Sequence, residues 1–278
     1  MPRVNLHCHD AHSSDASGTI AELAAAAASR GIEVLCVTNH VERILADGET
    51  WDFDIEEARP RFGDCLEEIE RRRADFPGLE LLFGAELEYR TEWREGLEEL
   101  SRALPFDFLL GSVHVVDGLQ ISGGPTVDEA FAGRTEAEVY GLYFEKVLEM
   151  VRWGGFDTVS HLDLVKRFGV RHHGPFRPER YARVVAAIFQ ECVRRGIGIE
   201  VNASGLVAPS AEPMPGLPLL AAARRAGVPF VTLGTDGHAP RHVDRGLAEV
   251  EALAREAGFN EVAVFRARSR FMTAIGPT

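Results

Sequence analysis

Two histidines near the start of the chain are spaced so that they can share one metal ion. His7 and His9 lie in the sequence NLHCHD (residues 5–10) and close a short apolar segment that we expect to be a β-strand. Alternate side chains of a strand lie on the same face, so the two imidazoles project together and can chelate one cation. The pair alone is weak evidence, because two histidines at this spacing also arise by chance on a solvent-exposed strand.

Further histidines and carboxylates end other apolar segments, and six of the ten histidines lie at five separate strand ends. The full set is His7, His9, His40, Glu86, His114, His161, Asp236 and His238. Converging imidazoles and carboxylates suit zinc, iron or manganese, and the set is too large for one tetrahedral ion. It indicates two or three metals, bridged by the two oxygens of Glu86. Asp15 could reach the same place, or could cap the helix that begins near Thr19.

The segments that must position these groups alternate between apolar strands and helices. We expect strands over residues 3–7, 33–38, 79–86, 106–113, 156–160, 197–201 and 229–234, with 261–266 as a further candidate. We expect helices over 19–30, 54–75, 91–103, 135–153, 178–195, 217–226 and 242–257. This alternation predicts a parallel sheet covered on both faces, and seven or eight units fit a closed β/α barrel. The candidate ligands would then lie at the carboxyl-end rim, where such barrels build their active sites.

The composition narrows the class of protein. The chain has 278 residues and a formal charge of −13, which repels nucleic acid at long range. Its four cysteines form no CxxC pair, and no stretch resembles a signal peptide or a membrane span. With no long linker or internal repeat, we expect one domain over 1–278, in a cytoplasmic monomer or small homo-oligomer that binds neither nucleic acid nor membranes.

In their order along the chain, these motifs resemble the PHP (polymerase and histidinol phosphatase) domain family. They are HxH at 7–9, Asp15, NH at 39–40, Glu86, GSVH at 111–114, SHLD at 160–163 and TDGH at 235–238. Three longer stretches are similar to the histidinol phosphatase branch: PFDFLLGSVHVVDG (105–118), SHLDLVKRFG (160–169) and IEVNASGL (199–206). The resemblance covers nearly the whole chain and implies a distorted α/β barrel of seven β/α units with a trinuclear metal site.

The resemblance also implies how the metals are divided among the ligands. One metal would bind His7, His9, Glu86 and Asp236, a second Glu86, His114 and His161, and a third Asp15, His40 and His238. The family usually has aspartate where this chain has Asn5 and Asn39, and we expect both to orient ligand histidines. Asp15 stands where relatives often have histidine, and an oxygen ligand there favours manganese or iron.

The reaction implied by the resemblance is hydrolysis of a small phosphate monoester, most of all L-histidinol phosphate. The metals would lower the pKa of a bridging water to about 7 and so supply hydroxide for in-line attack. Candidate catalytic residues are Glu86, Asp236 and His238, and candidates for binding phosphate or substrate are Lys166, Arg167 and Asn202. Lys166 and Arg167 could equally be an ordinary basic helix start. We expect solvated roles for His172, His173 and His242.

Three alternatives remain. A PHP phosphoesterase acting on nucleotides or other small phosphates would use the same ligands, because substrate choice depends on the loops at 41–53, 116–134 and 170–178. A non-catalytic PHP module or polymerase accessory is a second alternative, disfavoured by the complete ligand set and the acidic charge. A metal-dependent amidohydrolase usually carries a metal-bridging lysine at a strand end, which this sequence does not supply convincingly.

Overall fold

A computed structural model describes residues 2–44 and 51–276. Its main sheet has seven strands in the order β1-β2-β5-β6-β9-β10-β11. These are β1 (Val4–Cys8), β2 (Val34–His40), β5 (Glu80–Glu88), β6 (Phe108–Ser112), β9 (Thr158–Val159), β10 (Gly198–Asn202) and β11 (Val231–Gly234). Each registered pair of neighbours in this sheet is parallel.

The sheet curls until its first and last strands meet at their carboxyl ends. There the backbone N–H of Asp236 donates to the carbonyl of His7 at 2.9 Å, and the N–H of His9 donates to the carbonyl of Gly237 at 3.0 Å. These bonds join the two strands only at the carboxyl rim, so the barrel is distorted and nearly closed. The expected α/β barrel of seven parallel strands is confirmed.

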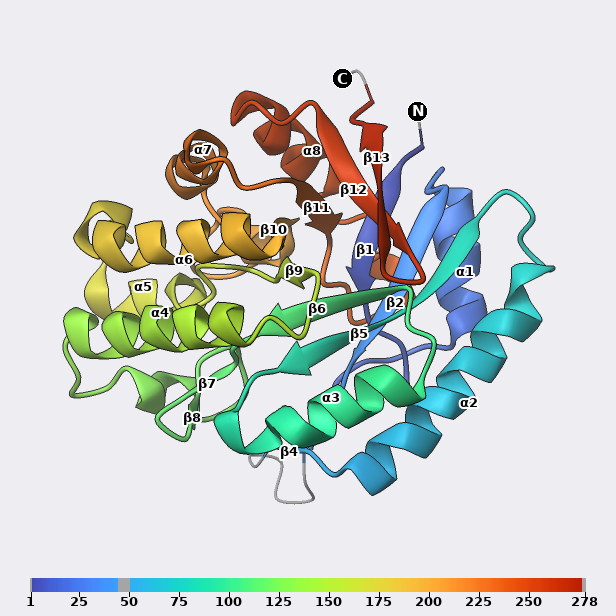
Figure 1. Ribbon diagram of the computed structural model, residues 1–278, viewed down its shortest axis with the longest axis horizontal. Helices are drawn as coiled ribbons and strands as arrows, with labels where there is room; N and C mark the ends of the chain where they lie inside the picture. The colour runs from blue at the N-terminus through green and yellow to red at the C-terminus, as the bar shows by residue number, and fades with distance from the viewer. Residues whose placement is uncertain (1, 45–50, 277–278) are drawn as a thin grey trace.

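Helices surround the barrel (Figure 1). They are α1 (Ile20–Ser29), α2 (Ile55–Arg73), α3 (Arg94–Ala103), α4 (Glu136–Trp153), α5 (Lys166–His173), α6 (Ala182–Arg195), α7 (Leu217–Ala226) and α8 (Leu247–Glu256). Short 3-10 turns are η1 (Thr91–Trp93), η2 (Val127–Ala130), η3 (Pro178–Tyr181), η4 (Ser204–Val207) and η5 (Pro240–His242). Local sequence explains the ends of α4: Thr135 and Glu138 form a capping box, and Gly154 ends the helix in the left-handed conformation.

Three small hairpins add to the barrel. They are β3 (Arg43–Ile44) with β4 (Trp51–Asp52), β7 (Val115–Val116) with β8 (Leu119–Gln120), and β12 (Glu261–Arg266) with β13 (Ser269–Ala274). The segment 261–266 is thus a strand, as the sequence suggested, but it pairs antiparallel with β13 instead of joining the barrel. Ala267 and Arg268 between them both have positive φ, which is the geometry that reverses a chain tightly between two strands.

The β12–β13 hairpin packs against the amino end of the barrel. The Phe265 ring centroid lies 5.0 Å from that of Phe108 and 5.5 Å from that of Phe230. These rings belong to one buried apolar cluster with inward-facing residues of the first strands, such as Leu6 and Cys36. Apolar side chains therefore fill the amino end, while the polar residues gather at the carboxyl end.

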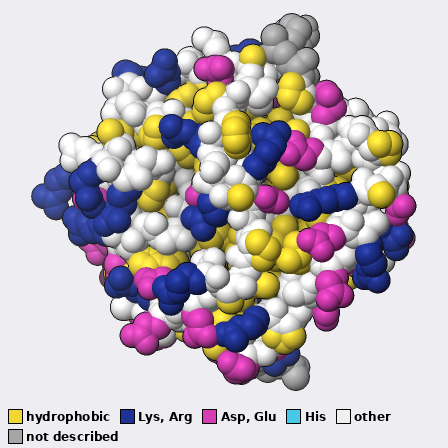
Figure 2. Space-filling view, turned by 45° about the vertical axis from the view of Figure 1, so that its right-hand side comes forward, with side chains coloured by type: hydrophobic (Ala, Val, Ile, Leu, Met, Phe, Trp, Pro, Cys, Tyr) yellow, Lys and Arg dark blue, Asp and Glu magenta, His cyan; other side chains and the backbone are white. Residues whose placement is uncertain are grey.

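Charged and apolar side chains are mixed on part of the outer surface (Figure 2). Figure 2 shows acidic and basic side chains interspersed with small apolar patches on the face that it draws. Among the described residues, none of the helices combines the length and the apolar character that crossing a bilayer requires.

The packing of Phe265 gives a first prediction. Phe265→Ala would leave a cavity between two aromatic rings, and we expect it to lower the free energy of unfolding by about 3–5 kcal/mol. Phe271→Ala is the matched control, because Phe271 lies on the partner strand of the same hairpin and is 49% exposed. Its expected effect is within about 0.5 kcal/mol. Urea denaturation followed by circular dichroism measures both, and equal losses would contradict a sealing role for Phe265.

Candidate metal centre

Strand register brings the predicted ligands to one rim. In the pairing of β2 with β5, His40 stands directly opposite Glu86. His7 lies within β1, and the remaining predicted ligands lie beyond the ends of β1, β6, β9 and β11. The bond between Asp236 and His7 that closes the barrel joins two of the ligands. The expectation that these residues converge at the carboxyl end is confirmed.

The first ligand group contains His7, His9, Glu86 and Asp236. The Nε2 atoms of His7 and His9 are 3.1 Å apart, and His7 Nε2 is 3.2 Å from Glu86 Oε2. His9 Nε2 lies 3.4 Å from Asp236 Oδ1. Ligand atoms around a tetrahedral ion with bonds of about 2.0–2.1 Å are roughly 3.3 Å apart. The distances in this group are close to that value, so the group fits a single divalent ion. All four side chains are buried.

The second ligand group contains Glu86, His114 and His161. Glu86 Oε1 lies 3.3 Å from His114 Nε2 and 2.9 Å from His161 Nε2, and the two imidazole nitrogens are 3.3 Å apart. The oxygen of Glu86 that faces this group is the one that the first group does not use. Glu86 is therefore placed to bridge two ions.

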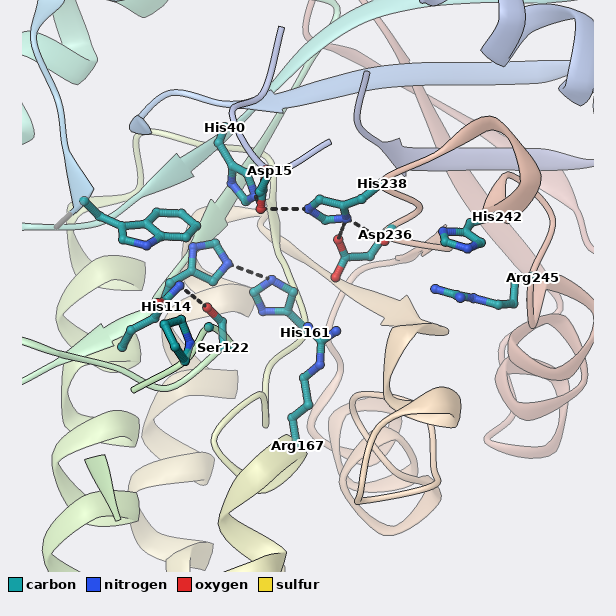
Figure 3. Close-up of a pocket in the computed structure, with 15 residues that line it drawn as sticks. Asp15, His40, His114, Ser122, His161, Arg167, Asp236, His238, His242 and Arg245 are labelled. Atoms are coloured by element: carbon teal, nitrogen blue, oxygen red, sulfur yellow. Dashed lines mark hydrogen bonds and ion pairs between the residues drawn. The ribbon is translucent and has the colours of Figure 1, made fainter. Parts of the chain in front are cut away.

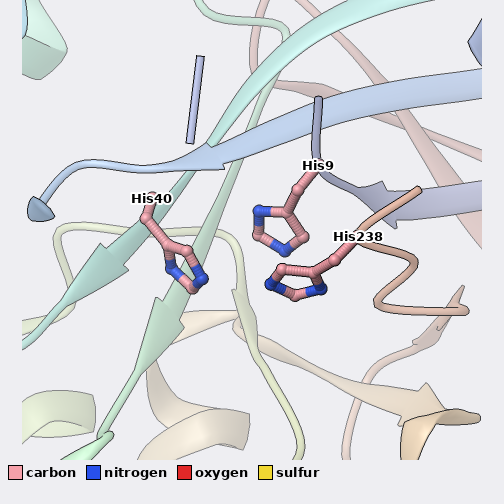
Figure 4. Close-up of side chains that lie close together, drawn as sticks. All are labelled: His9, His40 and His238. Atoms are coloured by element: carbon pink, nitrogen blue, oxygen red, sulfur yellow. The ribbon is translucent and has the colours of Figure 1, made fainter. Parts of the chain in front are cut away.

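The third ligand group contains Asp15, His40 and His238. Asp15 Oδ2 lies 3.5 Å from His40 Nε2 and 3.2 Å from His238 Nε2. The His9 ring packs beside both of these imidazoles, with ring centroids 4.4 Å from His40 and 4.2 Å from His238 (Figure 4). The side chain of Thr19, and not that of Asp15, caps α1, so Asp15 is free to face the centre.

Buried carboxylates face the second nitrogens of the ligand imidazoles. His7 Nδ1 lies 2.7 Å from Glu200 Oε1, and His114 Nδ1 lies 3.2 Å from Glu88 Oε2. Glu42 Oε1 is 3.2 Å from His40 Nδ1 and 3.4 Å from His114 Nδ1. Of these contacts, the one between His7 and Glu200 has hydrogen-bond geometry, and it fixes the orientation of the His7 ring. Sequence reasoning missed all three glutamates, because the sequence does not distinguish a buried carboxylate at the barrel rim from one that faces water.

The two asparagines act differently. Asn5 Oδ1 accepts the backbone N–H of His7 at 3.1 Å and of Thr235 at 3.2 Å, so it orients the strand end that carries His7 and not the imidazole itself. Asn39 Oδ1 accepts the Ser13 hydroxyl at 2.9 Å, and that hydroxyl lies 3.4 Å from His9 Nδ1. Asn39 thus reaches a ligand ring through Ser13.

Charges at the centre shift the pKa of most members. Burial raises the pKa of Glu86, but the surrounding imidazoles outweigh it and hold that pKa well below 4.5. Burial likewise lowers the pKa of His7, His40 and His114, but the neighbouring carboxylates hold each pKa well above 6.5. The pKa of His9 falls to about 3, because of burial and the two imidazoles beside it. Carboxylates thus stay ionised here, as metal ligands must be.

A cavity of about 380 Å³ opens over the ligand groups (Figure 3). Besides members of all three groups, its lining includes Trp51, Arg167, His242 and Arg245. His242, for which we expected a solvated role, is half-buried and lines this cavity, because the turn after His238 brings it back there. Arg245 was not singled out from the sequence, since it lies well beyond the strand end.

The structure places two predicted substrate contacts elsewhere. Lys166 is fully buried, with Nζ 2.9 Å from Asp163 Oδ2 and donating to the Pro213 carbonyl at 2.9 Å. Asn202 is also buried, and its Nδ2 donates to Glu200 Oε2 at 3.0 Å. Neither residue lines the cavity, whereas Arg167 does, because consecutive residues of a helical turn point about 100° apart.

The two adjacent histidines of the segment 170–178 lie in α5, and not in a loop as expected. His172 Nε2 is 2.9 Å from Asp128 Oδ1, and the ring of His173 packs edge-on against Tyr140. Neither histidine lines the cavity over the ligand groups. The Nε2 atom of His173 is buried, so the expected solvated role does not extend to that atom.

Metal affinity is expected to rise with pH beyond 6.5. A metal must displace the protons of His7, His40 and His114, and the pKa of each lies well above that value, so competition ends only at higher pH. In the metal-free protein the same protons stabilise the fold below 6.5, and this contribution is lost as pH rises through the raised values. Chelator-buffered Zn²⁺ titrations between about pH 6 and 9 measure the affinity. An affinity for Zn²⁺ that levels off near pH 6.5 would contradict the raised pKa of these histidines.

Comparison with known proteins agrees with this geometry. The PHP domain model matches residues 5–204. A probable histidinol-phosphatase of Deinococcus radiodurans is 30% identical over 263 residues, which cover 94% of this chain and 96% of that protein. A crystal structure of histidinol phosphate phosphatase from Lactococcus lactis, complexed with zinc, L-histidinol and phosphate, has a TM-score of 0.83 at 22% identity and covers 97% of this chain and 98% of its own. The chain therefore belongs to the PHP domain family.

Proposed function

We propose that this protein hydrolyses L-histidinol phosphate to L-histidinol and phosphate. The observation that carries the proposal is the placement of Glu86, whose two oxygens each face a separate set of imidazoles at 2.9–3.3 Å. A carboxylate bridge between two ions is a recurring arrangement in enzymes that cleave phosphate esters. The choice of substrate is supported by the Deinococcus protein, named a probable histidinol-phosphatase, and by the Lactococcus protein, named a histidinol-phosphatase.

The cofactors proposed are two or three divalent ions of zinc, manganese or iron, with at most one ion in each ligand group. The imidazole-rich first and second groups suit zinc, and the carboxylate of Asp15 makes the third group more suitable for manganese or iron. When bound, the ions supply a water of lowered pKa and a Lewis acid for the phosphoryl oxygens.

The residues around the cavity have complementary roles. Arg167 and Arg245 approach it from the side away from His40 (Figure 3), where guanidinium groups can hold phosphoryl oxygens through paired hydrogen bonds. Trp51 covers another side, with its ring centroid 5.3 Å from His40 and 5.7 Å from His114. The cavity of about 380 Å³ is in the range typical of small-molecule sites, which suits a small phosphorylated substrate.

The proposal is tested by phosphate release from L-histidinol phosphate, compared with a panel of nucleotides and sugar phosphates. The protein is first stripped of metal and then refilled with zinc, manganese or iron. We expect kcat/KM for L-histidinol phosphate to exceed that for the panel by about a hundredfold or more. Activity on other phosphates alone would show that the proposed substrate is wrong. No activity with any of the metals would contradict the proposal that the protein is a phosphatase.

Glu86→Gln is expected to lower kcat by about a thousandfold, because an amide has one oxygen and cannot bridge two ions. Metal content of the dialysed protein should fall with it. Glu80→Gln is the matched control, since Glu80 begins the same strand at the far end from the centre and its side chain is 35% exposed. Elemental analysis and phosphate release measure both variants, and a fully loaded Glu86→Gln protein would contradict the bridge.

Arg167→Ala is expected to lower kcat/KM by about 10- to 100-fold, chiefly through KM, because it removes a charged hydrogen bond to phosphate. Arg171→Ala is the control: Arg171 lies one turn further along α5, pairs with Asp128 and does not line the cavity. Steady-state kinetics on L-histidinol phosphate separate the two. If both variants behave alike, Arg167 does not bind the phosphate.

A further inference from the structure

Glu200 is a fully buried carboxylate on β10 that accepts three hydrogen bonds. Its Oε1 accepts from His7 Nδ1 at 2.7 Å. Its Oε2 accepts the backbone N–H of His161 at 2.9 Å and Nδ2 of Asn202 at 3.0 Å. An ionised carboxylate is acceptor-only, so every group around it is matched to a negative charge. Glu200 is not among the residues that line the cavity.

The contact with His7 decides how that ring is used. A carboxylate on Nδ1 keeps the ring proton there and leaves the lone pair on Nε2. His7 Nε2 is the atom that lies 3.1 Å from His9 Nε2 and 3.2 Å from Glu86 Oε2. Glu200 therefore directs the metal-binding nitrogen of His7 into the first ligand group.

The contact with His161 acts on the backbone. His161 has a φ of +23°, a conformation that residues with a side chain adopt rarely and at a cost. The N–H bond to Glu200 and a contact of 3.3 Å between the Tyr143 hydroxyl and the His161 carbonyl hold this turn. The turn sets the direction of the imidazole, whose Nε2 belongs to the second ligand group.

The neighbouring strand leaves room for this arrangement. Gly234 on β11 lies beside the pair, and a Cβ built there would come within 2.0 Å of Glu200 Oε1 and 2.5 Å of His7 Cβ. A glycine at this position thus allows the carboxylate to approach the ring closely. The space, the charge and the three donors all favour one placement of Glu200.

We propose that Glu200 is a positioning residue that prepares two of the three ligand groups at once, through the ring of His7 and the backbone of His161. The proposal rests on the metal centre proposed above and is independent of which phosphate ester is the substrate. It makes the first and second groups respond together to a change at a residue that touches no metal.

Glu200→Gln tests this. Glutamine keeps the shape but turns one oxygen into a donor, which then faces His7 Nδ1 or the N–H of His161. With Zn²⁺ as the only ligand, we expect two equivalents of metal, and not a single equivalent, to bind about 10- to 100-fold more weakly than in the wild type. Competition with a chromophoric chelator measures the affinity and the number of tight equivalents, without any substrate.

Asp163→Asn is the matched control, a buried carboxylate paired with Lys166 that contacts no ligand histidine. It is expected to lower the thermal midpoint and to leave Zn²⁺ affinity unchanged. Glu200→Asp is a second variant that retains the charge but is one methylene shorter. It cannot reach both His7 Nδ1 and the N–H of His161, so it should also weaken Zn²⁺ binding. Wild-type affinity in a folded Glu200 variant, or equal losses in Asp163→Asn, would overturn the proposal. If the wild-type protein is inactive on L-histidinol phosphate but the Glu200 variants still bind Zn²⁺ more weakly than it does, the proposed function is wrong and this inference stands.

Discussion

The buried negative charge of Glu86 is the constraint on which the rest of the centre depends. A carboxylate removed from water is stable only when cations or donors surround it, and the strands supply imidazoles from four directions. Their arrival requires the direct pairing of β2 with β5 and the closure of the barrel between β1 and β11. A shift of one residue in either would turn His40 or His7 away from the barrel. The strand register that forms the barrel thus also places the imidazoles that balance the charge of Glu86.

Much of the architecture could be predicted from the sequence because its signal is local. Apolar strands that alternate with capped helices indicate a β/α barrel, and the rim rule then locates the polar residues. The β12–β13 hairpin could not be anticipated in the same way. Segment 261–266 looks like any barrel strand, and its turn at Ala267 and Arg268 lacks the Asn-Gly or Asp-Gly that usually marks a tight reversal. Only packing against Phe108 and Phe230 distinguishes it.

The ligand residues were predictable for a chemical reason, and their supporting residues were not. Histidine at the end of an apolar strand is unusual enough to be noticed, as with His114 and His161. Glu200, by contrast, lies within a strand, where sequence alone does not distinguish a buried partner from a solvent-facing charge. The same limit separates Lys166 from Arg167: adjacent basic residues look equivalent until the helix turns one inward to Asp163 and the other toward the cavity.

The closed amino end of the barrel has a practical consequence. β1 begins there, and β13 lies near the start of β11 (Figure 1). Met272 and Glu261 share a small cavity with Pro229. The ligand groups occupy the opposite end. A carrier protein or a solid support coupled to side chains near the start of β1 or the end of β13 would therefore attach behind the barrel, with the mouth of the cavity facing solution. Immobilised forms of the protein should then keep free exchange of small molecules with the medium.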